Sequence, residues 1–288
     1  EIRSPLSDPR LGVHDGDYLL AVDGHPLTTD RDPWAAFQGL AGKDVSLTIS
    51  RDASGRDVRT VVVKALKSEM MLRETAWVER NREYVSRATN GKVGYIFVRD
   101  TGTSGQDQLE LQYKAQHTLD GLIIDARFNS GGAFGDRLVE LLNRPPLIYF
   151  HRRYGGDYPL PEQAFAGPKA FITNGWSISG GDGFPLQFEA AHAGVVIGTR
   201  TTGALIGPNG YFTLINGIII SAPPMRVYSA EGHWPKGNSV VPDIEILNDP
   251  EALARGHDQQ LDAAISYEEK AMEQVRKVST PEGDNGHG

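Results

Sequence analysis

Two short clusters of small and polar residues could supply a site for acyl-transfer chemistry. The first, NSGG at residues 129–132, follows the apolar run GLIIDARF, and the second, SISGGD at residues 177–182, follows the apolar run KAFIT. A serine at the start of a helix can act as a nucleophile. Backbone N–H groups in a glycine-rich turn can stabilise the oxyanion that forms when a nucleophile attacks a carbonyl. Ser179 is therefore the candidate nucleophile, with the N–H groups of Gly180 and of the Gly131-Gly132 turn as the oxyanion hole.

A structural interpretation of the same residues stays open at this point. Ser179 and Asp182 form the S-x-x-D pattern of a helix capping box, which needs no chemistry. The NSGG cluster could likewise bind a phosphate or only turn the chain. The residues alone do not choose between a catalytic serine and a helix cap.

The elements around these clusters predict an α/β domain. From residue 91 onwards, apolar runs typical of buried strands alternate with helical patterns, and both clusters stand between such a run and a helix. Asn216-Gly217 predicts a β-hairpin. Residues 256–277 predict a final amphipathic helix.

The first 66 residues differ and predict a small β-rich domain. The run YLLAV leads into the turn signal Asp23-Gly24, Asp32 and Pro33 suit a short helix, and two β-rich runs follow. This order resembles the second half of a PDZ domain, a fold that binds peptides by strand addition, although a generic β-rich domain has the same pattern. The expected organisation is a partial PDZ-like domain at 1–66, a connecting helix at 67–90, a catalytic subdomain at 91–276 and a flexible tail at 277–288.

Composition excludes several classes of function. The 288 residues carry a formal net charge of −8 and no cysteine. The acidic balance argues against nucleic acid as a partner, and no apolar run is long enough to suggest a membrane span. Disulfides, a cysteine nucleophile and thiolate metal sites are excluded, and a cytoplasmic location is expected. No metal-binding spacing is present, so we expect neither a metal nor a cofactor.

Four segments together resemble the tricorn protease family of serine peptidases, which is related to the C-terminal processing peptidases. They are GLIIDARFNSGG, FITNGWSISGGDGFP, VVIGTRTTGALIG and VVPDIEI, in this order. The resemblance implies a PDZ-like segment followed by a layered, crotonase-like α/β core. It places the nucleophile on Ser179, with Ser177 as second choice, and the oxyanion donors on Gly180 and Gly132. It also implies peptide substrates and a homo-oligomer.

The general base departs from the related patterns. The C-terminal processing peptidases use a lysine in a stretch that corresponds to GTRTTGALIG, which contains none. Tricorn enzymes use a histidine from a subdomain that precedes the PDZ domain. The resemblance thus implies a base outside this chain. His151 and His233 are the alternatives within it.

Three further positions depart from the tricorn pattern. Gly180 stands where an aspartate usually follows the nucleophile. Lys236 stands where a glutamate orients the catalytic groups, with Glu231 nearby. Phe150 stands where an aspartate confers a preference for basic side chains, with Asp157 a little further on, so we expect a different or broader specificity.

Three hypotheses follow from these observations. The first is a serine peptidase that hydrolyses peptides or unfolded polypeptides. The second is an inactive peptide-binding scaffold of the same fold, suggested by Gly180, Lys236 and the missing base. The third is an acyl-CoA enzyme of the crotonase type, whose oxyanion hole also uses glycine-rich strand ends.

Overall fold

The computed structural model describes residues 3–133, 135–154, 156–207, 210–233 and 239–279. It divides into two compact units, Glu1–Arg80 and Asn81–Gly288. Each unit is described by itself.

The first unit contains a four-stranded antiparallel sheet of order β2-β1-β3-β4. Asp23 and Gly24 form the expected turn between β1 and β2, with φ of 48° and 77°. The Trp34 N–H donates to Asp32 Oδ1 at 2.9 Å, so Asp32 caps a short helix as expected, although this helix is of the 3-10 type. The strands are β1 (Tyr18–Val22), β2 (His25–Pro26), β3 (Asp44–Ser50) and β4 (Val58–Lys64), and the 3-10 helices are η1 (Pro5–Ser7), η2 (Pro9–Leu11) and η3 (Pro33–Phe37).

The second unit is built on a five-stranded parallel sheet of order β13-β10-β9-β6-β5. Every residue of β6 and β9 is buried, as their continuous apolar runs predict for central parallel strands. The expected α/β fold is therefore confirmed. The strands are β5 (Val93–Phe97), β6 (Gly121–Asp125), β9 (Lys169–Thr173), β10 (Val195–Gly198) and β13 (Ile244–Glu245).

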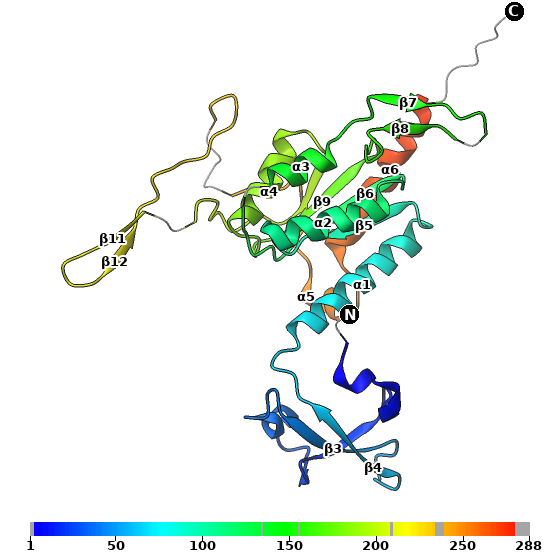
Figure 1. Cartoon of the computed structure of the whole chain (residues 1–288), viewed down its shortest axis with the longest axis vertical. Coiled ribbons are helices and arrows are strands. Elements are labelled where there is room, and N and C mark those ends of the chain that lie inside the picture. The colour runs from blue at the N-terminus through cyan, green and yellow to red at the C-terminus, as the bar shows by residue number, and fades with distance from the viewer. Residues whose placement is uncertain (1–2, 134, 155, 208–209, 234–238, 280–288) are drawn as a thin grey trace, which may run out of the picture. The chain divides into compact units, whose positions relative to one another are not determined.

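Helices cover both faces of this sheet (Figure 1). Leu122 and Ile124 of β6 join a buried cluster with residues of α2, α3 and α4. Helix α6 packs against β6, β9 and β10; because side chains alternate along a strand, it covers the other face. α6 runs past residue 276 to Ser279, and residues 280–288 of the expected tail lie outside the described residues. The helices are α1 (Met70–Ala88), α2 (Thr103–Gln116), α3 (Asp136–Leu142), α4 (Gly180–Ala190), α5 (Pro250–Ala254) and α6 (Gln259–Ser279).

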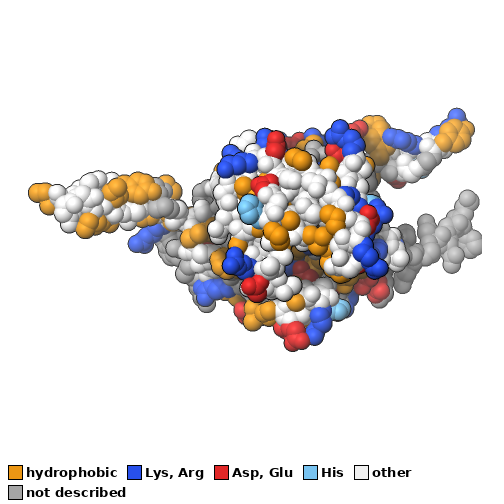
Figure 2. Space-filling model, turned by 90° about the horizontal axis from the view of Figure 1, so that it is seen from below, with side chains coloured by type: hydrophobic (Ala, Val, Ile, Leu, Met, Phe, Trp, Pro, Cys, Tyr) orange, Lys and Arg blue, Asp and Glu red, His pale blue; other side chains and the backbone are white. Residues whose placement is uncertain are grey.

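Two hairpins of the second unit carry exposed apolar side chains. The first is β7 (Ile148–Phe150) with β8 (Tyr158–Leu160), and the second is β11 (Tyr211–Thr213) with β12 (Ile219–Ser221). The β11–β12 hairpin turns at Asn216-Gly217 as expected, with Gly217 at φ 82°. It extends away from the α/β core, and Figure 2 shows its apolar side chains in the open.

Candidate active site

The two small-residue clusters lie against each other at the carboxyl ends of β6 and β9, which are neighbouring parallel strands. The Ile178 N–H donates to the Asn129 carbonyl at 3.0 Å, which joins the clusters directly. The Asn129 side chain also fixes the glycine turn, because its Oδ1 accepts from the Gly131 N–H at 2.9 Å. A Cβ built on Gly131 would lie 2.9 Å from the Ser179 Cβ, so only a glycine lets the turn approach the serine this closely.

Ser179 has a strained backbone at the point where the loop becomes α4. Its φ is 59° and its ψ is −113°, outside the usual regions for a residue with a Cβ. Such strain on a serine between a strand and a helix is characteristic of nucleophile elbows, which hold the hydroxyl outside the helix. Ser179 is half-buried, whereas Gly180 and Gly181 behind it are buried.

Asp182 holds this conformation. Its Oδ2 accepts from the Ser179 N–H at 2.8 Å, which is the carboxylate half of the capping box. The same buried carboxylate accepts from the N–H groups of Gly203 and Ala204, at 2.8 and 3.0 Å. The expected cap is thus present and is compatible with a nucleophile. It also ties the segment after β10 to the start of α4.

The backbone of Gly132 lies close to that of Gly180, the residue after Ser179. A Cβ built on Gly180 would lie 3.0 Å from the Gly132 nitrogen, so the two glycines are adjacent. Within the described part of the chain, neither N–H donates a hydrogen bond. Gly180 is also the first residue of α4, where the helix dipole favours negative charge. Two free donors beside Ser179 can stabilise a tetrahedral oxyanion.

Thr101 explains why residue 180 is a glycine. Its hydroxyl is buried and lies 2.0 Å from the position that a Cβ on Gly180 would take. Thr101 also bridges to Gly132. An aspartate at position 180 would collide with this hydroxyl, so here the glycine is a steric requirement of the site.

A buried ionic network supports the loop after β6. Arg127 donates to Asp125 through two nitrogens and to Asp258 Oδ2 at 2.6 Å. Tyr95 donates its hydroxyl to Asp125 Oδ2 at 2.7 Å. Burial and the Asp125 charge raise the pKa of Tyr95 well above its ordinary value, so Tyr95 stays protonated. The network fixes Arg127 two residues before Asn129.

Comparison with known proteins supports what this geometry suggests. Residues 92–246 match the family model described as Peptidase family S41, and residues 1–68 match the Tricorn protease PDZ domain. The chain belongs to peptidase family S41.

The relatives of this S41 chain are tricorn proteases. It is 33% identical over 264 residues to the tricorn protease of Thermoplasma volcanium, with 91% of the chain aligned. It is 34% identical to tricorn protease homolog 1 of Streptomyces coelicolor, with 98% of the chain aligned. The crystal structure of the tricorn protease superposes on 95% of the chain, with a TM-score of 0.79 and 29% identity. The chain spans 25% and 26% of the length of these two relatives.

Ser177, the second choice for the nucleophile, has a structural role in this S41 chain. It is fully buried, its Oγ donates to the Ala126 carbonyl at 2.9 Å, and it accepts from Thr173 Oγ1 at 3.1 Å. A hydroxyl that is buried and already bonded cannot reach a substrate, so the structure favours Ser179.

No histidine among the described residues forms a hydrogen bond or ion pair with Ser179. His151 lies on the β7–β8 hairpin and binds Asp157 Oδ1 at 2.6 Å. His233 is exposed beyond the β11–β12 hairpin, and its described hydrogen bonds join it to Ser229. The corresponding stretch after β10 contains threonines in place of a lysine, and Thr202 donates its N–H to the Ser177 carbonyl at 3.0 Å.

Glu231, the candidate for an orienting carboxylate, forms no described hydrogen bond or ion pair with Ser179. Glu231 is exposed, and its charge interacts with His233 and His192. His192 follows the C-terminal end of α4, whereas Ser179 precedes its N-terminal end. Lys236 lies outside the described residues.

Phe150 and Asp157, the expected specificity residues, both belong to the β7–β8 hairpin. The Phe150 ring stacks on Tyr158 at 5.3 Å, and Asp157 pairs with His151. The described contacts of these two residues remain within the hairpin.

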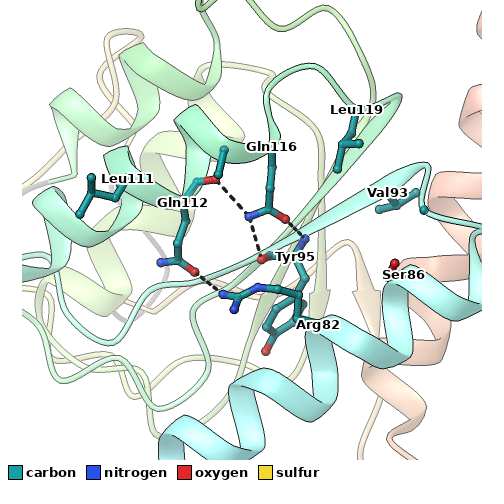
Figure 3. Close-up of a pocket in the computed structure, with 10 residues that line it drawn as sticks. Arg82, Ser86, Val93, Tyr95, Leu111, Gln112, Gln116 and Leu119 are labelled. Atoms are coloured by element: carbon teal, nitrogen blue, oxygen red, sulfur yellow. Dashed lines mark hydrogen bonds between the residues drawn. The ribbon is translucent and has the colours of Figure 1, made fainter. Parts of the chain in front are cut away.

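The described residues contain no group of three or more acidic or histidine side chains that could hold a metal ion. No helix among them is long and apolar enough to cross a membrane. A shallow pocket of about 480 Å³ lies away from Ser179, between α1, β5 and α2 (Figure 3). Gln112 and Gln116 line it and bind the backbone of β5, which gives this pocket a structural explanation.

Sequence reasoning missed the two asparagines that hold the loops. Asn129 was part of the NSGG cluster, but its role as the link to Ile178 was not foreseen. Asn174 Oδ1 accepts from the N–H groups of Phe128 and Trp176, each at 3.1 Å, and so joins the loops a second time. The available signal was an asparagine directly after each of the apolar runs GLIIDARF and KAFIT, because asparagine side chains readily bind nearby backbone groups.

Proposed function

We propose that the protein containing this chain is a serine peptidase in which Ser179 is the nucleophile. The observation that carries the proposal is the strained Ser179 beside the N–H groups of Gly132 and Gly180, neither of which donates a hydrogen bond to a described residue. Membership of peptidase family S41 supports it independently. The proposed substrates are peptides or unfolded polypeptides.

The proposed reaction proceeds through an acyl-enzyme. A general base accepts the proton of the Ser179 hydroxyl while Oγ bonds to the peptide carbonyl carbon. The carbonyl oxygen becomes an oxyanion held by Gly132 and Gly180. When the C–N bond breaks, the protonated base gives its proton to the leaving amine. Water then hydrolyses the ester with the same base. The base is a histidine from outside this chain, consistent with the relatives' greater length.

The first unit would bind an extended peptide, as PDZ domains do. We further propose a cytoplasmic homo-oligomer. Support for assembly comes from the β11–β12 hairpin, whose exposed apolar residues include Phe212, Ile215 and Ile219. Apolar side chains this far from the core are typical of protein interfaces.

The test is the intact mass of the full-length protein after reaction with a fluorophosphonate probe. We expect one adduct on the natural protein and none on Ser179→Ala, with loss of peptide hydrolysis in the same variant. Ser104→Ala, an exposed serine of α2, is the matched control and should be labelled normally.

An inactive scaffold is the second candidate, because no described base faces Ser179. That function predicts peptide binding by the full-length protein without any adduct. An adduct that survives Ser179→Ala would instead overturn the assignment of the nucleophile.

A further inference from the structure

The loops that carry the candidate site also present three exposed apolar side chains beside Ser179. Trp176 is 74% exposed, Phe128 54% and Ile178 38%. Hydrogen bonds bring the backbones of two of them together, because Asn174 Oδ1 accepts from the N–H groups of both Phe128 and Trp176. Ile178 directly precedes Ser179. We call Phe128, Trp176 and Ile178 the apolar rim.

Hydrogen bonds hold the backbone around Trp176 in place. Asn174 and Ser177 on either side of Trp176 are buried, and the Ser177 N–H donates to the Asn174 carbonyl at 3.0 Å. Gly175 is held from the neighbouring loop, because its carbonyl accepts from Thr202 Oγ1 at 2.8 Å. Trp176 is thus exposed on a well-fixed loop. Preorganised aromatic side chains bind ligands at low entropic cost.

Phe128 adds a second, independent observation. Its φ is 63°, which is costly for a bulky residue. Even so, Phe128 is more than half exposed. Strained residues are concentrated at functional sites. The position beside Ser179 suggests that the function is substrate contact.

Charge in the same loops agrees with an apolar ligand. Residues 126–135 contain no acidic residue, and residues 174–182 contain one, Asp182. Asp182 is buried and committed to three backbone N–H groups. Arg127, the one basic residue of these loops, is buried and paired with Asp125 and Asp258. These loops therefore offer a substrate apolar surface and no accessible carboxylate.

We propose that the apolar rim binds an apolar side chain of the substrate next to the scissile bond. This inference rests on the proposed peptidase function and specifies its substrate class: peptides with large aliphatic or aromatic residues at the cleavage site. The rim, rather than Phe150 and Asp157 of the β7–β8 hairpin, would then set this preference.

The experiment compares matched fluorogenic peptides that differ at one position beside the scissile bond, bearing leucine, phenylalanine, alanine or lysine. We expect the full-length protein to prefer leucine and phenylalanine. Trp176→Ala and Phe128→Ala should each lower kcat/KM for these peptides about tenfold relative to the alanine peptide, mainly through KM. Trp176→Phe should restore most of the preference. Tyr154→Ala, 85% exposed on the β7–β8 hairpin, is the control and should change nothing.

Binding of the same peptides to Ser179→Ala protein separates this inference from the proposed function. If the natural protein hydrolyses no peptide, the peptidase proposal fails. The rim inference still predicts that the leucine peptide binds more tightly than the alanine peptide, and that Trp176→Ala abolishes this difference. If hydrolysis depends on Ser179 but the preference survives both rim substitutions, the rim inference is overturned. A preference lost in Phe150→Ala alone would assign specificity to the hairpin. A change of oligomeric mass in Trp176→Ala with unchanged selectivity would make the rim a subunit contact and overturn the inference too.

Discussion

Gly131 lies directly against Ser179, and a Cβ on Gly131 would come within 2.9 Å of the serine Cβ and 2.8 Å of the Ile178 carbonyl oxygen. Gly131 also has φ 88°, a conformation that a residue with a Cβ rarely adopts. Gly131→Ala must therefore displace either the turn or the serine. Displacements of about 1 Å at a reacting group cost about 100-fold in rate. We expect a loss of that order in the rate of fluorophosphonate labelling.

Gly156→Ala provides the control for this prediction, because a Cβ at Gly156 would meet no atom within 4 Å. Its labelling rate should equal that of the natural protein. Equal rates for Gly131→Ala would show that the turn does not constrain Ser179.

Asp182 connects the nucleophile to the segment after β10, and its loss should affect both stability and reactivity. In the natural protein three backbone N–H groups donate to the Asp182 carboxylate. In Asp182→Asn an NH2 group replaces one carboxylate oxygen, so at least one of these N–H groups loses its acceptor. Hydrogen bonds to charged groups contribute about 1.5–3 kcal/mol each, so we expect a loss of this size in the free energy of unfolding. Urea unfolding measures it. Labelling of Ser179 should slow as well, because a neutral amide oxygen holds the strained Ser179 N–H more weakly than a carboxylate does.

Asp107→Asn, an exposed position on α2, controls for the change of charge and should alter neither quantity. If Asp182→Asn is destabilised but labels at the natural rate, the carboxylate serves the fold alone and does not position the serine.

How much of this site could be predicted depended on how local each interaction is. Asp182 stands three positions after Ser179, and β6 lies within an apolar run, so both the cap and the strand can be predicted from the sequence. Asp182 also accepts hydrogen bonds from the N–H groups of Gly203 and Ala204, which lie far from it in the sequence and approach it only in the folded chain. The collision between Thr101 and any side chain at position 180 is equally non-local, so Gly180 looked like a departure until the structure explained it. Counting residues could not place Glu231 relative to Ser179, because the path of a loop is not set by sequence distance.

Gln112 and Gln116 protect the exposed edge of the parallel sheet. β5 is an edge strand, and each glutamine forms a pair of hydrogen bonds with its backbone, as a neighbouring strand would. Figure 3 shows the pair between Gln116 and Tyr95. Gln116 binds the N–H and carbonyl of Tyr95 at 2.8 and 3.2 Å, and Gln112 binds those of Phe97 at 3.1 and 2.9 Å. Open strand edges promote pairing between molecules. We expect the double variant Gln112→Leu, Gln116→Leu to associate progressively as concentration rises, measured by light scattering.

Gln108→Leu places the same side chain on an exposed position of α2 and separates surface hydrophobicity from edge exposure. It should keep the natural mass at every concentration. Identical association of the two variants would contradict edge protection.

Glu268 of α6 should make the stability of the second unit depend on pH. Its carboxyl is fully buried, and burial raises its pKa from 4.5 to about 8, opposed by the charge of Lys169. Between these two values the folded state keeps a proton that the unfolded state has lost. Stability should therefore fall as pH rises from about 4.5 to about 8, by at most about 1.4 kcal/mol per pH unit.

Two neighbouring titratable groups also contribute to the pH dependence. Burial lowers the pKa of Lys169 from 10.5, so its folded form binds fewer protons just below that value and stability should rise again there with pH. Burial, followed by the charge of Glu268, raises the pKa of Tyr267 above 10.0. Glu268→Gln keeps the shape of the side chain but cannot ionise, so it should reduce the decline between about pH 5 and 8. The part of the decline that comes from Glu189 of α4, whose pKa burial raises to about 7, should remain.

Hydrogen exchange of the β6 and β9 amides, which α6 covers, measures this stability for the second unit alone. Exposed Glu269 offers the control, since Glu269→Gln removes a charge from the adjacent position of the same helix. Its pH profile should follow that of the natural protein. If the stability of Glu268→Gln declines with pH as much as that of the natural protein, another group causes the decline, because the glutamine has no proton to lose.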